Sequence, residues 1–298
     1  LGELLSIGNS KDQAGNYLFS GTQTKTEPFR ITEGRIAGGS GDRVVGVDYL
    51  GNVDSGVAEI SEGATAQTHL IGTRVFWAEQ QQIYSTVDAG QYRVQRDSAI
   101  RIDGTQIQLT TGDTVSAVVA KINDANVAVR ARIDPVANGL VLETTSAHQI
   151  AAEDLGGGTV LQDLGILAPG GTHPPLNVSP TAHVFGGSVF DQIIALRDAL
   201  YEGSSEKVGT AGLRGIENAV TAMAGSLGDL GARDARLDVV GKRVAYMTPD
   251  LQGIESQIHD LDMADAITRL KTLESTNEAA LSATARALNR PKLLDFLR

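Results

Sequence analysis

The chain contains no cysteine among its 298 residues. This absence excludes disulfide bonds, cysteine-ligated zinc or iron–sulfur sites and thiol nucleophiles. Basic residues are also scarce, because 25 Lys and Arg stand against 36 Asp and Glu and leave a formal net charge of −11. This acidic balance argues against nucleic acid as a partner. No apolar run approaches the roughly 20 residues of a membrane span, and no basic-then-apolar leader follows Leu1.

Aromatic residues make up only 4% of the chain, and their distribution divides it. Eight precede Arg93, none lies between Arg93 and Val184, and five follow. The central stretch must therefore build its core from Val, Ile, Leu and Ala. The length and the 41% hydrophobic content suffice for about two domains. We expect an α+β protein with a β-rich, rod-like parent domain (1–80 with 184–260), an inserted outer α+β domain (81–183) and a terminal helix (261–298).

Short β-rich runs separated by glycines characterise the first part of the chain. The opening residues Leu1–Gly8 follow helical spacing and predict the end of a helix. Runs at 44–47, 57–60 and 74–76 then predict strands joined by turns.

The central stretch has the pattern of a small α+β module. Asp103-Gly104 between alternating apolar residues predicts a hairpin. Asp113 or Thr114 is suited to cap a helix, and the alternation from Val127 to Ile133 predicts a half-buried strand. Another strand is predicted at 140–142, and His173-Pro174-Pro175 predicts an extended linker.

Two helices are predicted after this module, from Phe190 to Glu202 and from about Leu213 to the end. In the second, apolar residues recur at alternating steps of 3 and 4, as at the a and d positions of coiled-coil heptads. We call these residues the helix seam: Leu237, Val240, Val244, Met247, Leu251, Ile254, Ile258 and Leu261. Pro249 is expected to kink this helix or to lie in an early turn of a restarted one. The seam requires a partner, because a helix cannot bury its own stripe.

The chain shows little chemistry suited to catalysis or metal binding. Its five histidines lack a ligand spacing such as H-x-x-x-H. The carboxylates of Asp260, Asp262 and Asp265 lack the Gly and terminal Glu of a calcium loop, and they suit the front of a helix. Phosphate-loop and nucleophile-elbow patterns are absent. We therefore predict a protein that is not an enzyme and has no catalytic residue, cofactor or metal site.

The stretch from Ser6 to Phe29, SIGNSKDQAGNYLFSGTQTKTEPF, contains the most specific motif. It resembles the flagellin superfamily and, more narrowly, the hook-associated protein 3 family, which forms the hook–filament junction of bacterial flagella. Two further segments are similar at the superfamily level: Ala264–Arg298 resembles the terminal helix, and Thr114–Leu167, with Ile122-Asn123, resembles the IN repeat. The residues of the first motif are Asn9, Lys11, Asp12, Gly15, Tyr17, Leu18, Phe19, Ser20 and Gly21.

The resemblance implies an extracellular structural subunit of the flagellum, exported by the flagellar type III apparatus. Its implied partners are other copies of itself, the preceding hook-associated junction protein, flagellin, and an export chaperone on the C-terminal helix. In the family, long N-terminal helices precede the motif, so we expect this chain to be a fragment. The residues expected to carry assembly are the helix seam together with Leu281, Leu288, Leu293, Leu294, Phe296 and Leu297.

Other functions remain open at this point. One is flagellin itself or the other junction protein, although flagellin usually lacks the Asn16–Gly21 stretch. Another is an adhesin-like module whose β-rich insert binds a carbohydrate or a host surface. A hydrolase with paired carboxylates has no supporting constellation. The seam likewise has three candidate partners, namely a remnant of the preceding helix, a sheet of the parent domain, or a neighbouring copy.

Overall fold

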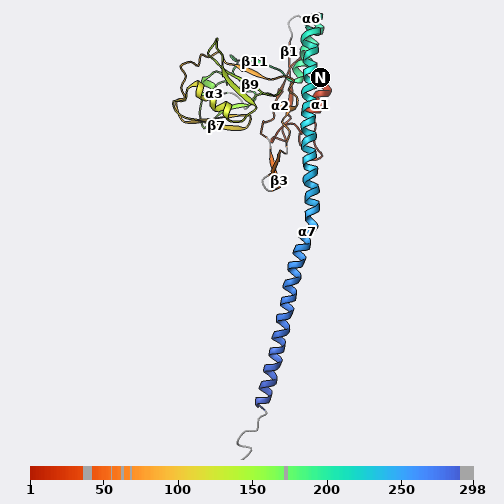
Figure 1. Cartoon of the computed structure of the whole chain (residues 1–298). Helices are drawn as coiled ribbons and strands as arrows, with labels where there is room; N and C mark the ends of the chain where they lie inside the picture. The colour runs from red at the N-terminus through yellow and green to blue at the C-terminus, as the bar shows by residue number, and fades with distance from the viewer. Residues whose placement is uncertain (36–41, 55, 62–63, 68, 171–173, 289–298) are drawn as a thin grey trace, which may run out of the picture. The chain divides into compact units, whose positions relative to one another are not determined.

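The computed structural model describes the chain except for residues 36–41, 55, 62–63, 68, 171–173 and 289–298. It is a mixed α+β protein with a long C-terminal helix, as predicted (Figure 1). The chain forms two compact units, Leu1–Asp234 and Ala235–Arg298. The elements in chain order are α1 (Gly2–Gly8), β1 (Phe29–Arg35), β2 (Asp42–Tyr49), β3 (Val57–Ser61), β4 (Ala64–Gln67), α2 (Gly72–Val75), β5 (Gln82–Tyr84), β6 (Ser98–Ile102), β7 (Thr105–Leu109), α3 (Val115–Asp124), β8 (Val129–Ile133), β9 (Leu140–Thr144), β10 (Ala152–Leu155), α4 (Val160–Asp163), β11 (His183–Phe185), α5 (Val189–Tyr201), α6 (Ser205–Lys207), the π-helix η1 (Val208–Gly212) and α7 (Leu213–Leu288).

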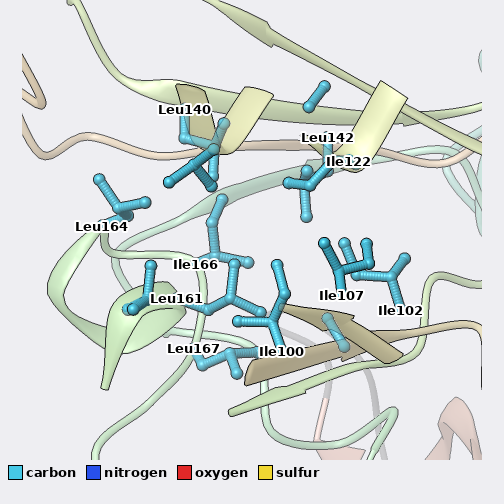
Figure 2. Packing of buried hydrophobic residues seen from close by; sticks show 14 of the residues in the cluster. Ile100, Ile102, Ile107, Ile122, Leu140, Leu142, Leu161, Leu164, Ile166 and Leu167 are labelled. Atoms are coloured by element: carbon cyan, nitrogen blue, oxygen red, sulfur yellow. The ribbon is translucent and has the colours of Figure 1, made fainter. Parts of the chain in front are cut away.

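The central part of the first unit surrounds an aliphatic core. Two antiparallel sheets contribute to it, one with strand order β10-β6-β7 and one with order β11-β5-β9-β8. Figure 2 shows Ile100 and Ile107 of the first sheet extending toward Leu140 and Leu142 of the second. Every fully buried member of this cluster is aliphatic, so the prediction from the missing aromatics is confirmed. Burial of each large member contributes about 1.5–3 kcal/mol to stability.

The Ile122-Asn123 pair joins α3 to the edge of the second sheet. Thr114 caps α3 by accepting a hydrogen bond from the Ala117 N–H (3.2 Å), and Ile122 is fully buried in the aliphatic core. The Asn123 side chain donates to the Ala131 carbonyl (2.9 Å) and accepts from the Ala131 N–H (2.8 Å). Its amide therefore satisfies both backbone groups of one residue on edge strand β8, as a neighbouring strand would.

A second core in the first unit is aromatic. Phe29 of β1, Tyr49 of β2, Phe76 and Phe190 of α5 are buried together, and the ring centroid of Phe29 lies 5.0–5.4 Å from those of the other three. Such aromatic pairs are stabilising beyond the area that they bury. These residues come from four separate segments, so the cluster joins the start of the chain to α5.

Two segments, 76–84 and 183–189, connect the two cores, and we call them the two-strand stem. β5 and β11 pair in antiparallel fashion within it. Further along, the Ala78 N–H donates to the Gly187 carbonyl (3.0 Å), and the Val189 N–H donates to the Phe76 carbonyl (2.9 Å). The stem therefore enters and leaves the aliphatic core as one hydrogen-bonded ribbon.

Three local predictions were wrong. Residues 74–76 do not form a strand, because they lie in and just after helix α2, which brings Phe76 into the aromatic core. Packing of that one side chain overrides the β preference of the run. The extended linker is wrong at Pro174–Asn177, which forms turns, while His173 lies outside the described residues. The restarted helix is wrong too, since α7 continues through Pro249. The domain boundaries at 80/81, 183/184 and 260/261 stay predictions.

Candidate assembly interface

The helix seam lies exposed on the part of α7 in the second unit. On an α-helix, its alternating 3 and 4 spacing puts all of its members on one face. Leu237, Leu251 and Ile258 are 46%, 59% and 59% exposed, and Val244, Met247 and Ile254 are similar. Within the second unit, the described residues do not bury this apolar face. An exposed apolar face of this regularity is typical of a surface that binds another chain or segment.

The partner of the seam stays a prediction. Helix α1 belongs to the first unit, where its Leu4 packs with Ala219 and Met223 near the start of α7. A remnant of the preceding helix, a sheet of the parent domain and a neighbouring copy all stay candidates.

The remaining predicted assembly residues are only partly described. Leu281 and Leu288 are on α7 and are exposed. The backbone of Leu261 is helical, but its side chain lies outside the described part. Leu293, Leu294, Phe296 and Leu297 fall in 289–298 and lie outside the described residues as well. The role of all these residues in assembly stays a prediction.

Asn9, the first residue of the family motif, is hydrogen-bonded to the start of β1. Asn9 donates through Nδ2 to the Phe29 carbonyl (2.8 Å) and accepts at Oδ1 from the Phe29 N–H (2.9 Å). This pair of bonds holds the end of α1 against the strand that begins at Phe29. Lys11 instead lies over the Tyr17 ring, with Nζ 4.4 Å from its centroid. These contacts close the loop between Asn9 and Tyr17.

Asp12 organises the tip of this loop. Its Oδ1 accepts from the N–H groups of Ala14 and Asn16 (2.8 Å each), and its Oδ2 accepts from Asn16 Nδ2 (3.0 Å). Gly15 has φ +78°, a conformation that glycine adopts without strain. The hydrogen bonds from the Asn16 side chain and backbone, followed by that from Ala14, lower the pKa of Asp12 below 3.8.

We expect the Asp12 loop to lose its order only in acid. Because the folded pKa is lowered, the carboxylate bonds are present above pH 3.8 and are lost as the pH falls through the lower folded pKa. The amide chemical shifts of Ala14 and Asn16, followed by NMR against pH, should titrate together with a midpoint below 3.8. An Asp12→Asn variant should remove this titration. A midpoint at or above the ordinary value would contradict the arrangement.

The second half of the motif belongs to the aromatic core. The Phe19 ring packs edge-on against Phe76 at 5.1 Å, Ser20 is fully buried, and Leu18 is exposed. The φ of Gly21 is +63°, and a Cβ atom there would clash with the Asn52 carbonyl oxygen, so only glycine fits.

Tyr49 holds the same segment from the other side. Its hydroxyl lies 2.9 Å from the carbonyl oxygens of Phe19 and Asn52, and burial raises the pKa of Tyr49 above its usual range. The motif thus builds the fold near β1 and β2, and its described side chains do not converge on a ligand site.

A buried polar pair was missed by the sequence analysis. His148 Nε2 lies 2.8 Å from Asp103 Oδ2, and the two side chains are only 4% and 5% exposed. His148 Nδ1 lies 3.0 Å from the Ser146 carbonyl oxygen, and Asp103 Oδ1 accepts from the Ala151 N–H (3.1 Å). The pair therefore joins the β6–β7 turn to the segment before β10. Residues 45 positions apart carry no local sequence pattern, so only the fold brings them together.

Two other kinds of feature are absent from the described residues. They contain no group of three or more His, Cys, Asp or Glu that could hold a metal ion. Within the same part of the chain, no helix combines the length and apolarity needed to cross a membrane.

Two segments of the chain match family models of flagellins. Residues 213–297 match the bacterial flagellin C-terminal helical region, and residues 98–146 match the flagellin hook IN motif. The chain is also 26% identical to Flagellin A of Rhizobium meliloti over 138 residues, which are 46% of this chain and 32% of that protein. It therefore spans about a third of that relative's length.

Solved structures of flagellar proteins are similar as well. Flagellar hook-associated protein 3 from Legionella pneumophila has a TM-score of 0.42 and 14% identity, covering 87% of this chain and 78% of that one. FlgL of Xanthomonas campestris has a TM-score of 0.40 and 16% identity, covering 86% and 78%.

Two segments of the chain thus match models of the flagellin class. More particularly, one matches the flagellin C-terminal helical region and the other the hook IN motif, as the resemblance predicted. The matched IN segment begins at residue 98 rather than at the expected Thr114, so it includes the hairpin of β6 and β7.

Proposed function

We propose that this chain is a structural subunit of the bacterial flagellum, outside the cell, that forms the junction between hook and filament. The observation that carries the proposal is the exposed helix seam, which lies inside the segment matching the flagellin C-terminal helical region. Regularly spaced apolar residues left in water favour association with another helix. The function is mechanical and geometric, and no catalytic step is part of it.

The motif from Asn9 to Gly21 supports a junction subunit over a filament subunit. The sequence resembles the hook-associated protein 3 family there, and the motif residues build the fold next to the aromatic core. The finer partners that we propose are other copies of the chain, the preceding hook-associated protein, flagellin and an export chaperone. Export through the flagellar type III apparatus is part of the same proposal.

A filament subunit is the second candidate function. The 26% identity to Flagellin A over 46% of this chain favours it. The two functions differ in what the purified protein does, because a filament subunit polymerises alone into long filaments. A junction subunit instead restores filament attachment in cells that lack it.

We expect Leu251→Asp combined with Ile258→Asp to abolish assembly. Each aspartate would place a charge in a buried helix interface, at a cost of several kcal/mol. The measurement is complementation of a bacterial strain that lacks this subunit, read as swimming motility and as attached filaments in electron micrographs. Full motility with the double variant would refute the proposed role of the seam.

The matched control is Val239→Asp combined with Tyr246→Asp. These residues have the same seven-residue spacing, are 58% and 78% exposed, and lie off the seam on the same helix. They add the same two negative charges to the helix as the test pair. We expect this control to assemble normally, so a defect confined to the first variant assigns the effect to the seam.

A further inference from the structure

A cavity of about 340 Å³ lies within the first unit, and none of its lining residues belongs to the helix seam. Three segments form most of its wall. They are the first part of α7, the residues 69–75 that include α2, and the residues 146–148 that follow β9. The volume falls within the range of about 300–1,000 Å³ that is usual for small-molecule sites.

Direct contacts hold these three segments around the cavity. The Gln149 N–H donates to the Thr73 carbonyl (3.3 Å), which joins the segment after β9 to α2. Ser226 Oγ lies 3.5 Å from the Arg74 carbonyl oxygen, which places α7 against the same short helix. His148, whose ring is held by the buried pair described above, also lines the cavity. The cavity is therefore built by the fold of the first unit.

Two arginines line the cavity, Arg74 from α2 and Arg233 from α7. Within the part of the chain that the structure describes, neither guanidinium group makes an ion pair or a hydrogen bond. Asp229, one helical turn before Arg233, is the one carboxylate among the described residues that line the cavity. The local excess of positive charge contrasts with the net charge of −11 of the whole chain. Because a guanidinium group binds a carboxylate through paired hydrogen bonds, the two arginines suit an anionic ligand.

The rest of the lining suits a sugar better than a simple anion. Ser146 and Ser226 contribute hydroxyl groups, and the Asp229 carboxylate can accept hydrogen bonds from the hydroxyl groups of a ligand. Ile71 and Leu230 add apolar surface, against which the C–H groups of a sugar ring can pack. A plain anion would be attracted by the arginines but repelled by Asp229, because it has no hydroxyl group to donate.

We propose that this cavity binds an acidic sugar. Arg74 and Arg233 hold the carboxylate of the sugar, and Asp229 accepts a hydrogen bond from one of its hydroxyl groups. The inference goes beyond the proposed function and does not depend on it, because the cavity and the helix seam share no residue. It adds a binding function for acidic saccharides to a chain whose proposed role is structural.

Titration of the full chain with sodium glucuronate, followed by NMR, tests this proposal. Glucuronate should shift the backbone amide signals of Ala147, Ala222 and Gly225, which line the cavity. Uncharged glucose should bind at least about tenfold more weakly, because it lacks the carboxylate that the arginines bind. The absence of these shifts with glucuronate, or equal binding of glucose, would overturn the proposal.

Arg74→Gln and Arg233→Gln should each raise the dissociation constant of glucuronate about tenfold. Neither guanidinium group has a partner in the described chain, so both variants should fold, which circular dichroism checks. The matched control is Arg214→Gln, which removes the same charge from an exposed position of α7 outside the cavity. We expect this control to bind glucuronate as the unmodified chain does. An equal loss in the control would mean that binding follows only the net charge, and it would overturn the site.

Acetate and inorganic phosphate test whether the cavity takes an acidic sugar or any anion. The unmodified chain should bind glucuronate more tightly than either, since only the sugar has a hydroxyl group that donates to Asp229. Asp229→Ala should reduce this preference several-fold, because it removes both the acceptor for the sugar hydroxyl and the repulsion of the plain anions. Equal binding of the plain anions to the unmodified chain, or an unchanged preference in Asp229→Ala, would overturn the assignment to an acidic sugar.

Discussion

Replacing Phe190 with alanine is expected to lower the free energy of unfolding of the first unit by about 3–5 kcal/mol. Phe190 is fully buried in the aromatic core, and its ring centroid lies 5.0 Å from that of Phe29 and 5.7 Å from that of Phe76. Its neighbours come from segments far apart in the chain, so they cannot collapse easily into the space left by the ring. The loss is therefore a large fraction of the free energy of unfolding of a typical domain, which is about 5–15 kcal/mol.

Chemical denaturation of the full chain, followed by near-ultraviolet circular dichroism, measures this effect. The control is Phe185→Ala, because Phe185 is 58% exposed and contacts Tyr84 edge-on at 5.6 Å. We expect this control to cost about 1 kcal/mol or less. Similar losses for the two variants would mean that the aromatic core is not the stabilising element that its burial indicates.

Replacing Asp103 with alanine is expected to cost about 3 kcal/mol or more, because it leaves His148 buried without its partner. The carboxylate also accepts the Ala151 N–H, which would lose its acceptor. Asp103→Asn should cost less, since asparagine tolerates the positive φ of this position (49°) and retains one acceptor oxygen. Thermal and chemical unfolding of the three proteins gives the comparison.

Asp134 provides the matched control for this prediction. Its carboxylate accepts one backbone hydrogen bond, from the Ala137 N–H (2.9 Å), in the turn before β9, and the structure gives it no imidazole partner. Asp134→Ala should therefore cost about 1 kcal/mol. If Asp103→Ala lowers the free energy of unfolding no more than Asp134→Ala does, the buried Asp103–His148 contact contributes little to stability.

Features determined by neighbours in the sequence were predictable. The Asp103-Gly104 turn joins β6 and β7 as expected, because both residues adopt the positive φ that a tight hairpin needs (49° and 85°). Of the two caps that the sequence allowed, Asp113 and Thr114, the structure has Thr114, and the helix α5 was predicted correctly. In each of these cases, the residues that decide the structure lie within a few positions of one another.

Features determined by distant residues were not predictable. The sequence of residues 74–76 predicted a strand, but these residues lie in and just after helix α2. This conformation buries Phe76 against Phe29 and Phe190, which are far away in the sequence. The Asp103–His148 pair has no local pattern either. For the candidate interface, periodicity predicts one apolar face of α7, but it does not identify the partner of that face.

The two-strand stem has a mechanical consequence for any subunit exposed to flow. Drag on the aliphatic core would pull both strands of the stem in the same direction, so covalent backbone carries the tension in two parallel paths. The hydrogen bonds between the strands, such as that from Ala78 to Gly187, bear almost none of this pull. They resist torque instead, since twisting would shear the strands past each other. The stem thereby tethers the aliphatic core strongly against stretching, while the twist of the stem depends on a few weak bonds.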